Sequence, residues 1–158
     1  MNLVAPPLPR RLACWVYEGM LLFAVVFTAG YLFSTLSQTR HALDNRHPIQ
    51  LFLFVVLGIY FTWLWSKGQT LAMKTWKIRV VDVNGRPLTQ QRALLRYVLS
   101  YVWFMPPLLA SWLMGTAGAE AYLMMLAWVI VYALLTRFQT QRQYLHDVWA
   151  GTRLVSAD

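Results

Sequence analysis

Four long apolar runs dominate the chain, and each is about long enough to cross a lipid bilayer. A membrane-spanning helix needs roughly 20 mostly apolar residues. The pattern predicts such helices at about 12–36, 49–66, 93–114 and 117–136. The runs are continuous rather than alternating, which favours helices and excludes a membrane β-barrel. The predicted fold class is therefore an all-α membrane protein with four transmembrane helices in a single domain, residues 1–158.

The first apolar run follows Arg10 and Arg11, as the core of a cleaved signal peptide would. However, the run is too long for a signal core, and no small-x-small cleavage site follows it. We therefore expect a retained helix.

Proline interrupts the third run at Pro106-Pro107. Proline removes a helical hydrogen bond and clashes with the preceding turn. The sequence therefore predicts a kink or break in the third helix.

The segment between the second and third runs is basic and carries its own structural signals. Its first part, 70–76, predicts a short helix at the membrane interface. The side chains expected to face lipid are those of Leu71, Met73 and Trp76, and those expected to contact head-group phosphates are those of Lys74 and Lys77.

Two strand-like segments flank the last two apolar runs. Residues 78–83 are β-branched and lead into Asn84-Gly85, which suits a two-residue hairpin turn. Thr89 can then cap the next helix. Near the C-terminus Gly151 can end a short helix, after which 152–155 is again strand-like. We predict a small cytoplasmic β-hairpin, and we hypothesise that 78–83 pairs with 152–155.

The distribution of positive charge predicts the orientation. The net charge is +8, and most basic residues lie in the N-terminal segment, the middle loop and the C-terminal tail. The positive-inside rule therefore places both termini in the cytoplasm, in the cytoplasmic (inner) membrane of a bacterium. Because the basic residues lie between apolar blocks, the expected partner is anionic lipid head groups rather than nucleic acid.

Glu18 is a charge inside the first predicted helix. Such a charge costs about 2.5–3.5 kcal/mol on insertion scales, so it needs a partner or a function. Arg11 lies seven residues earlier on the same helix face, but about 10 Å away along the axis. We therefore expect Glu18 to find its partner on another helix.

Further charges are expected to face inward near the cytoplasmic boundary. Arg92 and Arg96 are four residues apart on one helix face, and His146-Asp147 follow the fourth run. A cluster of Glu18, Arg96 and Asp147 would neutralise its members. Two interpretations stay open: an ion-pair network that fixes helix packing, or a protonatable ion site. His146 is likewise either a proton shuttle or a hydrogen-bonded structural residue.

Signals for other chemistry are absent. The sequence contains no nucleophile elbow, Walker loop, His-Glu-x-x-His or dinucleotide glycine motif, so no enzyme is predicted. Cys14 is the single cysteine and is expected to be a small buried residue. No cofactor and no metal site is expected.

Several motifs together resemble the RDD family of integral membrane proteins, over nearly the whole chain. The matching segments are 9–13 (PRRLA) with an acid at Glu18, 68–71 (GQTL), 78–82 (IRVVD), 84–88 (NGRPL), 92–96 (RALLR) and 146–152 (HDVWAGT).

The resemblance assigns the family's arginine to Arg10 or Arg11, with Arg11 the better match, and its two aspartates to Glu18 and Asp147. Glu18 is a substitution that keeps the charge. A second departure is Ala72-Met73-Lys74, where the family has Gly-Lys-Arg.

The resemblance implies a transport function, with sodium/proton exchange suggested for some members. We expect a small ion transporter that acts as a homo-oligomer. The alternative is a non-catalytic membrane scaffold or accessory subunit that binds other membrane proteins or anionic lipid.

Overall fold

The computed structural model describes residues 4–38, 46–139 and 141–157. Most of the segment between the first two predicted helices, with Arg40, His41 and Asp44, lies outside the described residues. Six helical segments form the body: α1 (Leu8–Leu36), α2 (Arg46–Ser66), α4 (Gln90–Ser100), the 3-10 turn η1 (Tyr101–Trp103), α5 (Met105–Met114) and α6 (Ala119–Leu135). The remaining elements are α3 (Leu71–Thr75), α7 (Leu145–Trp149), β1 (Ile78–Asp82) and β2 (Thr152–Ser156).

The long helices have the length and composition of membrane spans. Within the described residues, 3 segments qualify: Leu8–Leu36, His47–Thr75 and Gln90–Met114. Helix α6 is equally apolar but has only 17 residues. The structure thus confirms a mostly helical, membrane-type fold with a small sheet.

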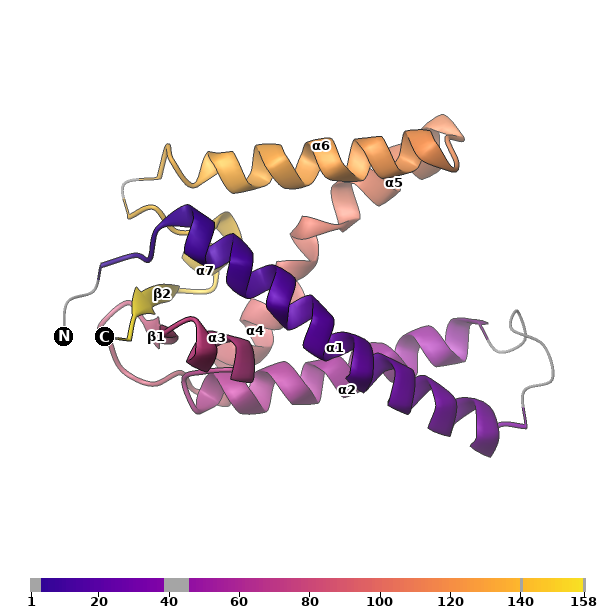
Figure 1. The fold of residues 1–158 in the computed structure, drawn as a ribbon, viewed down its shortest axis with the longest axis horizontal. Coiled ribbons are helices and arrows are strands. Elements are labelled where there is room, and N and C mark those ends of the chain that lie inside the picture. The colour runs from indigo at the N-terminus through magenta and orange to yellow at the C-terminus, as the bar shows by residue number, and fades with distance from the viewer. Residues whose placement is uncertain (1–3, 39–45, 140, 158) are drawn as a thin grey trace.

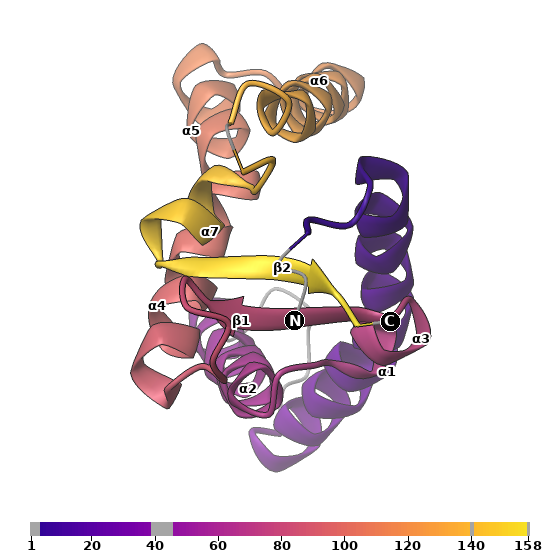
Figure 2. The same cartoon turned by 90° about the vertical axis from the view of Figure 1, so that its left-hand side faces the viewer.

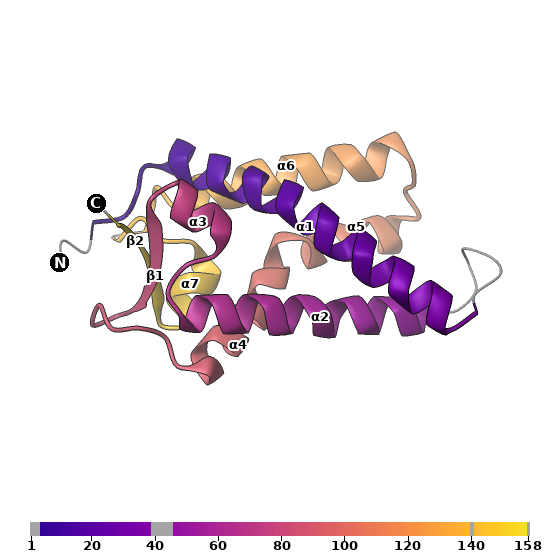
Figure 3. The same ribbon diagram turned by 60° about the horizontal axis from the view of Figure 1, so that its bottom comes forward.

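The helices extend from one end of the molecule, which we call the sheet end (Figure 1). Both termini, the two strands, α3 and α7 lie there, whereas the turn between α5 and α6 lies at the opposite end. Helix α2 packs against α4, and α5 packs against α6 (Figure 3).

The predicted break in the third run is present. Helix α4 tightens into η1, and Phe104 leaves helical geometry with a φ of −123°. Pro106 and Pro107 occupy the first turn of α5, where their missing N–H groups cost nothing. The break sends the chain from the α2 side to the α6 side.

The hypothesis that the middle loop pairs with the tail is confirmed. Strands β1 and β2 are antiparallel, with Val80 opposite Leu154 (Figure 2). Ile78, Val80 and Leu154 are buried, because this face of the sheet lies on the helix core.

The predicted β-hairpin within the middle loop is wrong. The Asp82 carboxylate instead ties the turn, because its Oδ1 accepts bonds from the backbone N–H groups of Asn84 and Arg86, both at 2.8 Å. Pro87 follows and has no N–H to donate to a returning strand. The chain goes directly to α4, which Thr89 caps as predicted.

The predicted interfacial helix exists as α3, but the prediction that Met73 faces lipid is wrong. Leu71 is exposed, whereas Met73 is buried rather than lipid-facing, because that side of α3 packs against α1. Trp76 is half-buried, and Lys74 and Lys77 are exposed.

The pairing of β1 with β2 predicts a specific disulfide. Arg79 lies directly opposite Val155, and opposed strand residues are close enough for a disulfide bond. In a Cys14→Ala background, Arg79→Cys with Val155→Cys should cross-link on mild oxidation of the purified protein, as a gel-mobility shift. The control pair is Arg79→Cys with Gln90→Cys, which a hairpin at Asn84-Gly85 would place in register. Preferential cross-linking of the control pair would contradict the observed sheet.

Candidate functional site

Buried polar side chains gather around a cavity of about 630 Å³ at the sheet end. Helices α1, α2 and α4 form its walls, and residues of β1, α7 and β2 close its base. The charged and polar lining residues include Arg11, Glu18, Arg96, Tyr144 and His146. Three of the predicted site residues therefore face one cavity, together with the candidate proton shuttle His146.

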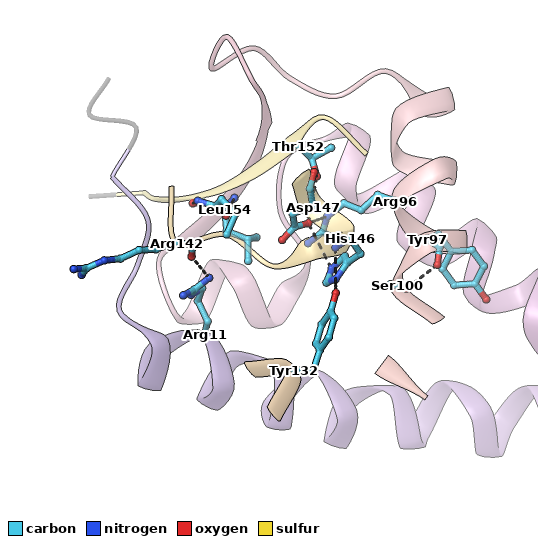
Figure 4. A network of polar contacts seen from close by, with 11 residues as sticks. Arg11, Arg96, Tyr97, Ser100, Tyr132, Arg142, His146, Asp147, Thr152 and Leu154 are labelled. Atoms are coloured by element: carbon cyan, nitrogen blue, oxygen red, sulfur yellow. Dashed lines mark hydrogen bonds and ion pairs between the residues drawn. The ribbon is translucent and has the colours of Figure 1, made fainter. Parts of the chain in front are cut away.

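Arg96 and Asp147 form a buried ion pair beside this cavity. The Arg96 Nε donates to Asp147 Oδ1 at 2.6 Å, and the two side chains are 4% and 0% exposed (Figure 4). The guanidinium also lies 4.0 Å from the centroid of the Trp65 ring. The Thr152 hydroxyl donates a hydrogen bond to the same carboxylate oxygen at 3.2 Å. The pair thus joins α4, α7, α2 and the start of β2.

Asp147 stays ionised in this setting. Burial alone would raise its pKa, but the charge of Arg96 and the hydrogen bonds from Arg96 and Thr152 outweigh burial. The net effect is an Asp147 pKa below its ordinary value.

His146 is held by Tyr132 of α6. The Tyr132 hydroxyl lies 2.9 Å from His146 Nδ1 and accepts a bond from the His146 backbone N–H at 3.1 Å. The other ring nitrogen, Nε2, lies 3.5 Å from Asp147 Oδ1. Burial lowers the pKa of His146 to about 4 in spite of the Asp147 carboxylate. The imidazole is therefore neutral at physiological pH.

Arg11 forms no salt bridge with an acid of the described residues. Its Nη1 donates to the backbone carbonyl of Arg142 at 2.7 Å, and its guanidinium lies over the Tyr144 ring, 4.8 Å from the centroid. These contacts tie the start of α1 to the segment before α7 (Figure 4).

Glu18 is bound by the hydroxyl groups of Tyr60 on α2 and Thr70 just before α3. Tyr60 donates to its Oε1 at 3.0 Å, and Thr70 donates to its Oε2. Among the described residues, no basic side chain lies within salt-bridge distance of this carboxylate. The partner on another helix is present, as expected, but it is not a cation.

The predicted cluster of Glu18, Arg96 and Asp147 therefore divides into two parts. One is the Arg96–Asp147 ion pair, and the other is the hydroxyl-bound Glu18. Arg92, which was predicted to face inward with Arg96, is instead exposed and lies 3.4 Å from Asp82 in the β1 turn. Its position at the exposed first turn of α4 explains the difference.

Comparison with known proteins identifies the chain. The family model described as "RDD family" matches residues 5–151. The chain belongs to the RDD family. Neither the curated proteins nor the solved structures contain a significant match to it.

In this RDD protein, the residues that the resemblance singled out lie at the sheet end. Arg11 and Glu18 line the cavity, and Asp147 lies behind Arg96. Arg96, not Arg11, forms the salt bridge with Asp147.

Several hydroxyl-bearing residues of the site were not predicted from the sequence. They are Tyr60, Thr70, Tyr132, Tyr144 and Thr152. Thr70 gave the clearest available signal, because it stands in the 68–71 motif and also caps α3. Tyrosines are also common at membrane interfaces, so the sequence alone does not indicate which of them face inward.

The neutral, buried His146 predicts a pH dependence of stability. Below about pH 6.5 the unfolded chain binds a proton that the folded chain excludes, so stability falls as pH falls from 6.5 towards 4. Between pH 7 and pH 5 we expect a loss of about 2 kcal/mol. The lowered pKa of Asp147 changes the stability only below this pH range, where the carboxylate of the unfolded chain becomes protonated.

The measurement is unfolding by SDS titration in mixed micelles at both pH values. His146→Gln should remove most of the loss, whereas the exposed His47→Gln should leave it unchanged. An unaltered pH dependence in His146→Gln would contradict this assignment.

Proposed function

We propose that this RDD protein crosses a bacterial cytoplasmic membrane four times, with the sheet end in the cytoplasm. The charge distribution supports this orientation. The described basic residues lie mainly at the sheet end, which the positive-inside rule assigns to the cytoplasm. Helix α6, with 17 residues, is at the short limit for a span, and it returns the chain from the far end to α7.

We further propose that the protein transports a small cation, a proton or sodium ion, and that Glu18 binds it. The observation that carries this proposal is a buried carboxylate that lines a cavity without a paired cation. Ionisable residues inside membrane segments are costly and mark ion pathways by default.

The ion pair of Arg96 with Asp147 bears on which acid could bind an ion. Had Arg96 paired with Glu18, packing alone would account for the acid in α1. Because Arg96 is bound to Asp147, the negative charge of Glu18 remains available for a mobile cation.

The groups around Glu18 suit both candidate ions. A proton needs only the carboxylate oxygen. A sodium ion would use the carboxylate with the hydroxyl oxygens of Tyr60 and Thr70, since hard cations prefer oxygen ligands. The neutral state of His146 and its contact with Tyr132 favour the structural interpretation of this residue over a proton shuttle.

A complete path across the membrane requires more than one copy of the chain in this proposal. The cavity lining on α1 ends at Leu22, whereas α1 continues to Leu36. Self-association of the protein would supply the remaining wall.

The second candidate function is a membrane scaffold or accessory subunit. The exposed Lys74 and Lys77 favour it, because they present positive charge beside α3 at the sheet end. Anionic lipid or an acidic surface of another membrane protein would fit there.

Flux measurements with reconstituted protein test the transport proposal. Liposomes under an imposed proton or sodium gradient should show flux with the wild-type protein. Glu18→Gln should reduce it to the level of empty liposomes. The variant should lose less than about 1.5 kcal/mol of stability, because the amide oxygen can still accept one hydrogen bond.

The matched control is Glu120→Gln, since Glu120 is an exposed acid in the first turn of α6. This variant should retain flux. No wild-type flux would overturn the transport proposal, and a membrane protein that copurifies in stoichiometric amount would then favour the scaffold. Equal flux in Glu18→Gln would exclude Glu18 as the ion site.

A further inference from the structure

Arg11 carries a positive charge that forms no salt bridge with an acidic side chain of the described residues, although the buried Asp147 carboxylate interacts with it electrostatically at longer range. Its contacts are a backbone carbonyl and an aromatic face, neither of which bears a formal charge. The side chain is nevertheless buried, with a residue exposure of 4%. A buried charge without a directly contacting counterion is unfavourable, so this site is suited to an anion.

Unpaired hydrogen-bond donors accompany this charge. Arg11 Nε, Arg96 Nη1 and the Tyr144 hydroxyl are buried and have no partner among the described residues. Buried donors in folded proteins are normally paired. All three residues line the cavity.

The rest of the cavity is apolar. Beyond the arginines its walls are formed by Leu57, Phe61 and Trp103, among other aliphatic and aromatic residues. Its volume of about 630 Å³ is in the range of known ligand pockets, roughly 300–1,000 Å³. The cavity thus combines a polar, cationic end with an apolar body.

The cavity also has a side that faces the bilayer. It is lined by Trp15, Val16 and Met20 of α1 and by Phe104 at the break before α5, and all four side chains are exposed. A ligand with an acyl chain can therefore enter from the lipid phase.

We propose that the cavity binds an anionic phospholipid, with its phosphate on Arg11 and Arg96 and one acyl chain in the apolar part. Guanidinium groups match phosphate oxygens in geometry and charge. The arginines lie towards the sheet end, where the cytoplasmic head groups lie in our orientation. This inference does not depend on cation transport.

The acids near the cavity are compatible with this ligand. Asp147 engages Arg96 through Nε, and both Arg96 Nη1 and Asp147 Oδ2 lack a hydrogen-bond partner among the described residues. Glu18 is seven residues beyond Arg11 on α1, about 10 Å deeper along the axis. Its oxygens are bound to Tyr60 and Thr70.

Native mass spectrometry of protein extracted from vesicles tests the proposal. Vesicles would contain phosphatidylglycerol and phosphatidylcholine in equal amounts, and wild type should retain one phosphatidylglycerol per protomer. Arg11→Gln should weaken retention at least tenfold, because it removes a charge-assisted phosphate contact. Arg10→Gln is the matched control, since it removes the same charge from the adjacent residue, which does not line the cavity. It should retain the lipid.

A second variant tests the apolar part independently of the charges. Gly19 lines the cavity, and a Cβ added there would meet no atom within 4 Å. Gly19→Leu should therefore fold and narrow the cavity, lowering retention. The control is Gly30→Leu. Gly30 also lies on α1 with no atom within 4 Å of an added Cβ, but it does not line the cavity, so this variant should leave lipid retention unchanged.

Equal retention of both lipids would overturn the proposal, as would unchanged retention in both Arg11→Gln and Gly19→Leu. Selective retention of an added free fatty acid in place of phosphatidylglycerol would also contradict it. Because retention is measured without a gradient, these outcomes are independent of whether Glu18 carries ions.

Discussion

The ion pair between Arg96 and Asp147 is the interaction on which the sheet end depends. Arg96 comes from α4, which packs on α2, and Asp147 comes from α7, which leads into β2. Both side chains are almost wholly buried, so each charge is costly without the other. The pair therefore fixes the C-terminal segment against the third predicted span. In turn it positions the strand that pairs with β1.

This pairing also determines which charges remain available. Arg96 is bound to Asp147 and forms no salt bridge with Glu18. Arg11 contacts a backbone carbonyl and a tyrosine ring. Within the described part of the chain, Glu18 and Arg11 thus face the same cavity without forming a salt bridge. We propose that the acid, Glu18, binds a mobile cation and that the base, Arg11, binds a lipid phosphate. Both assignments follow from the same observation, that the conventional partners are already engaged.

Much of the fold could be predicted because the bilayer imposes simple rules. Apolar run length gave the helices, Pro106-Pro107 gave the break before α5, and β-branching gave the strands. The hairpin prediction was wrong because the Asp82 side chain ties the turn, a local contact that Asn84-Gly85 does not reveal. Met73 was misplaced because the side of α3 that packs on α1 depends on tertiary structure.

The site was less predictable than the fold. The sequence identified Arg11, Glu18, Arg96 and Asp147 as charges that need partners, but charge alone does not decide which acid takes Arg96. That choice depends on the position of α7, which comes from the far end of the chain. The hydroxyl partners Tyr60 and Thr70 carry no charge and left no comparable signal in the sequence.

Double-mutant cycles at Arg96 test the central claim most directly. The stabilities of Arg96→Gln, Asp147→Asn, Glu18→Gln and the two double variants that contain Arg96→Gln would be measured by SDS titration. The account predicts a coupling energy of about 1–3 kcal/mol between Arg96 and Asp147, and a clearly smaller one between Arg96 and Glu18. A coupling to Glu18 as large as that to Asp147 would show that Glu18 belongs to the structural network, and would contradict the account.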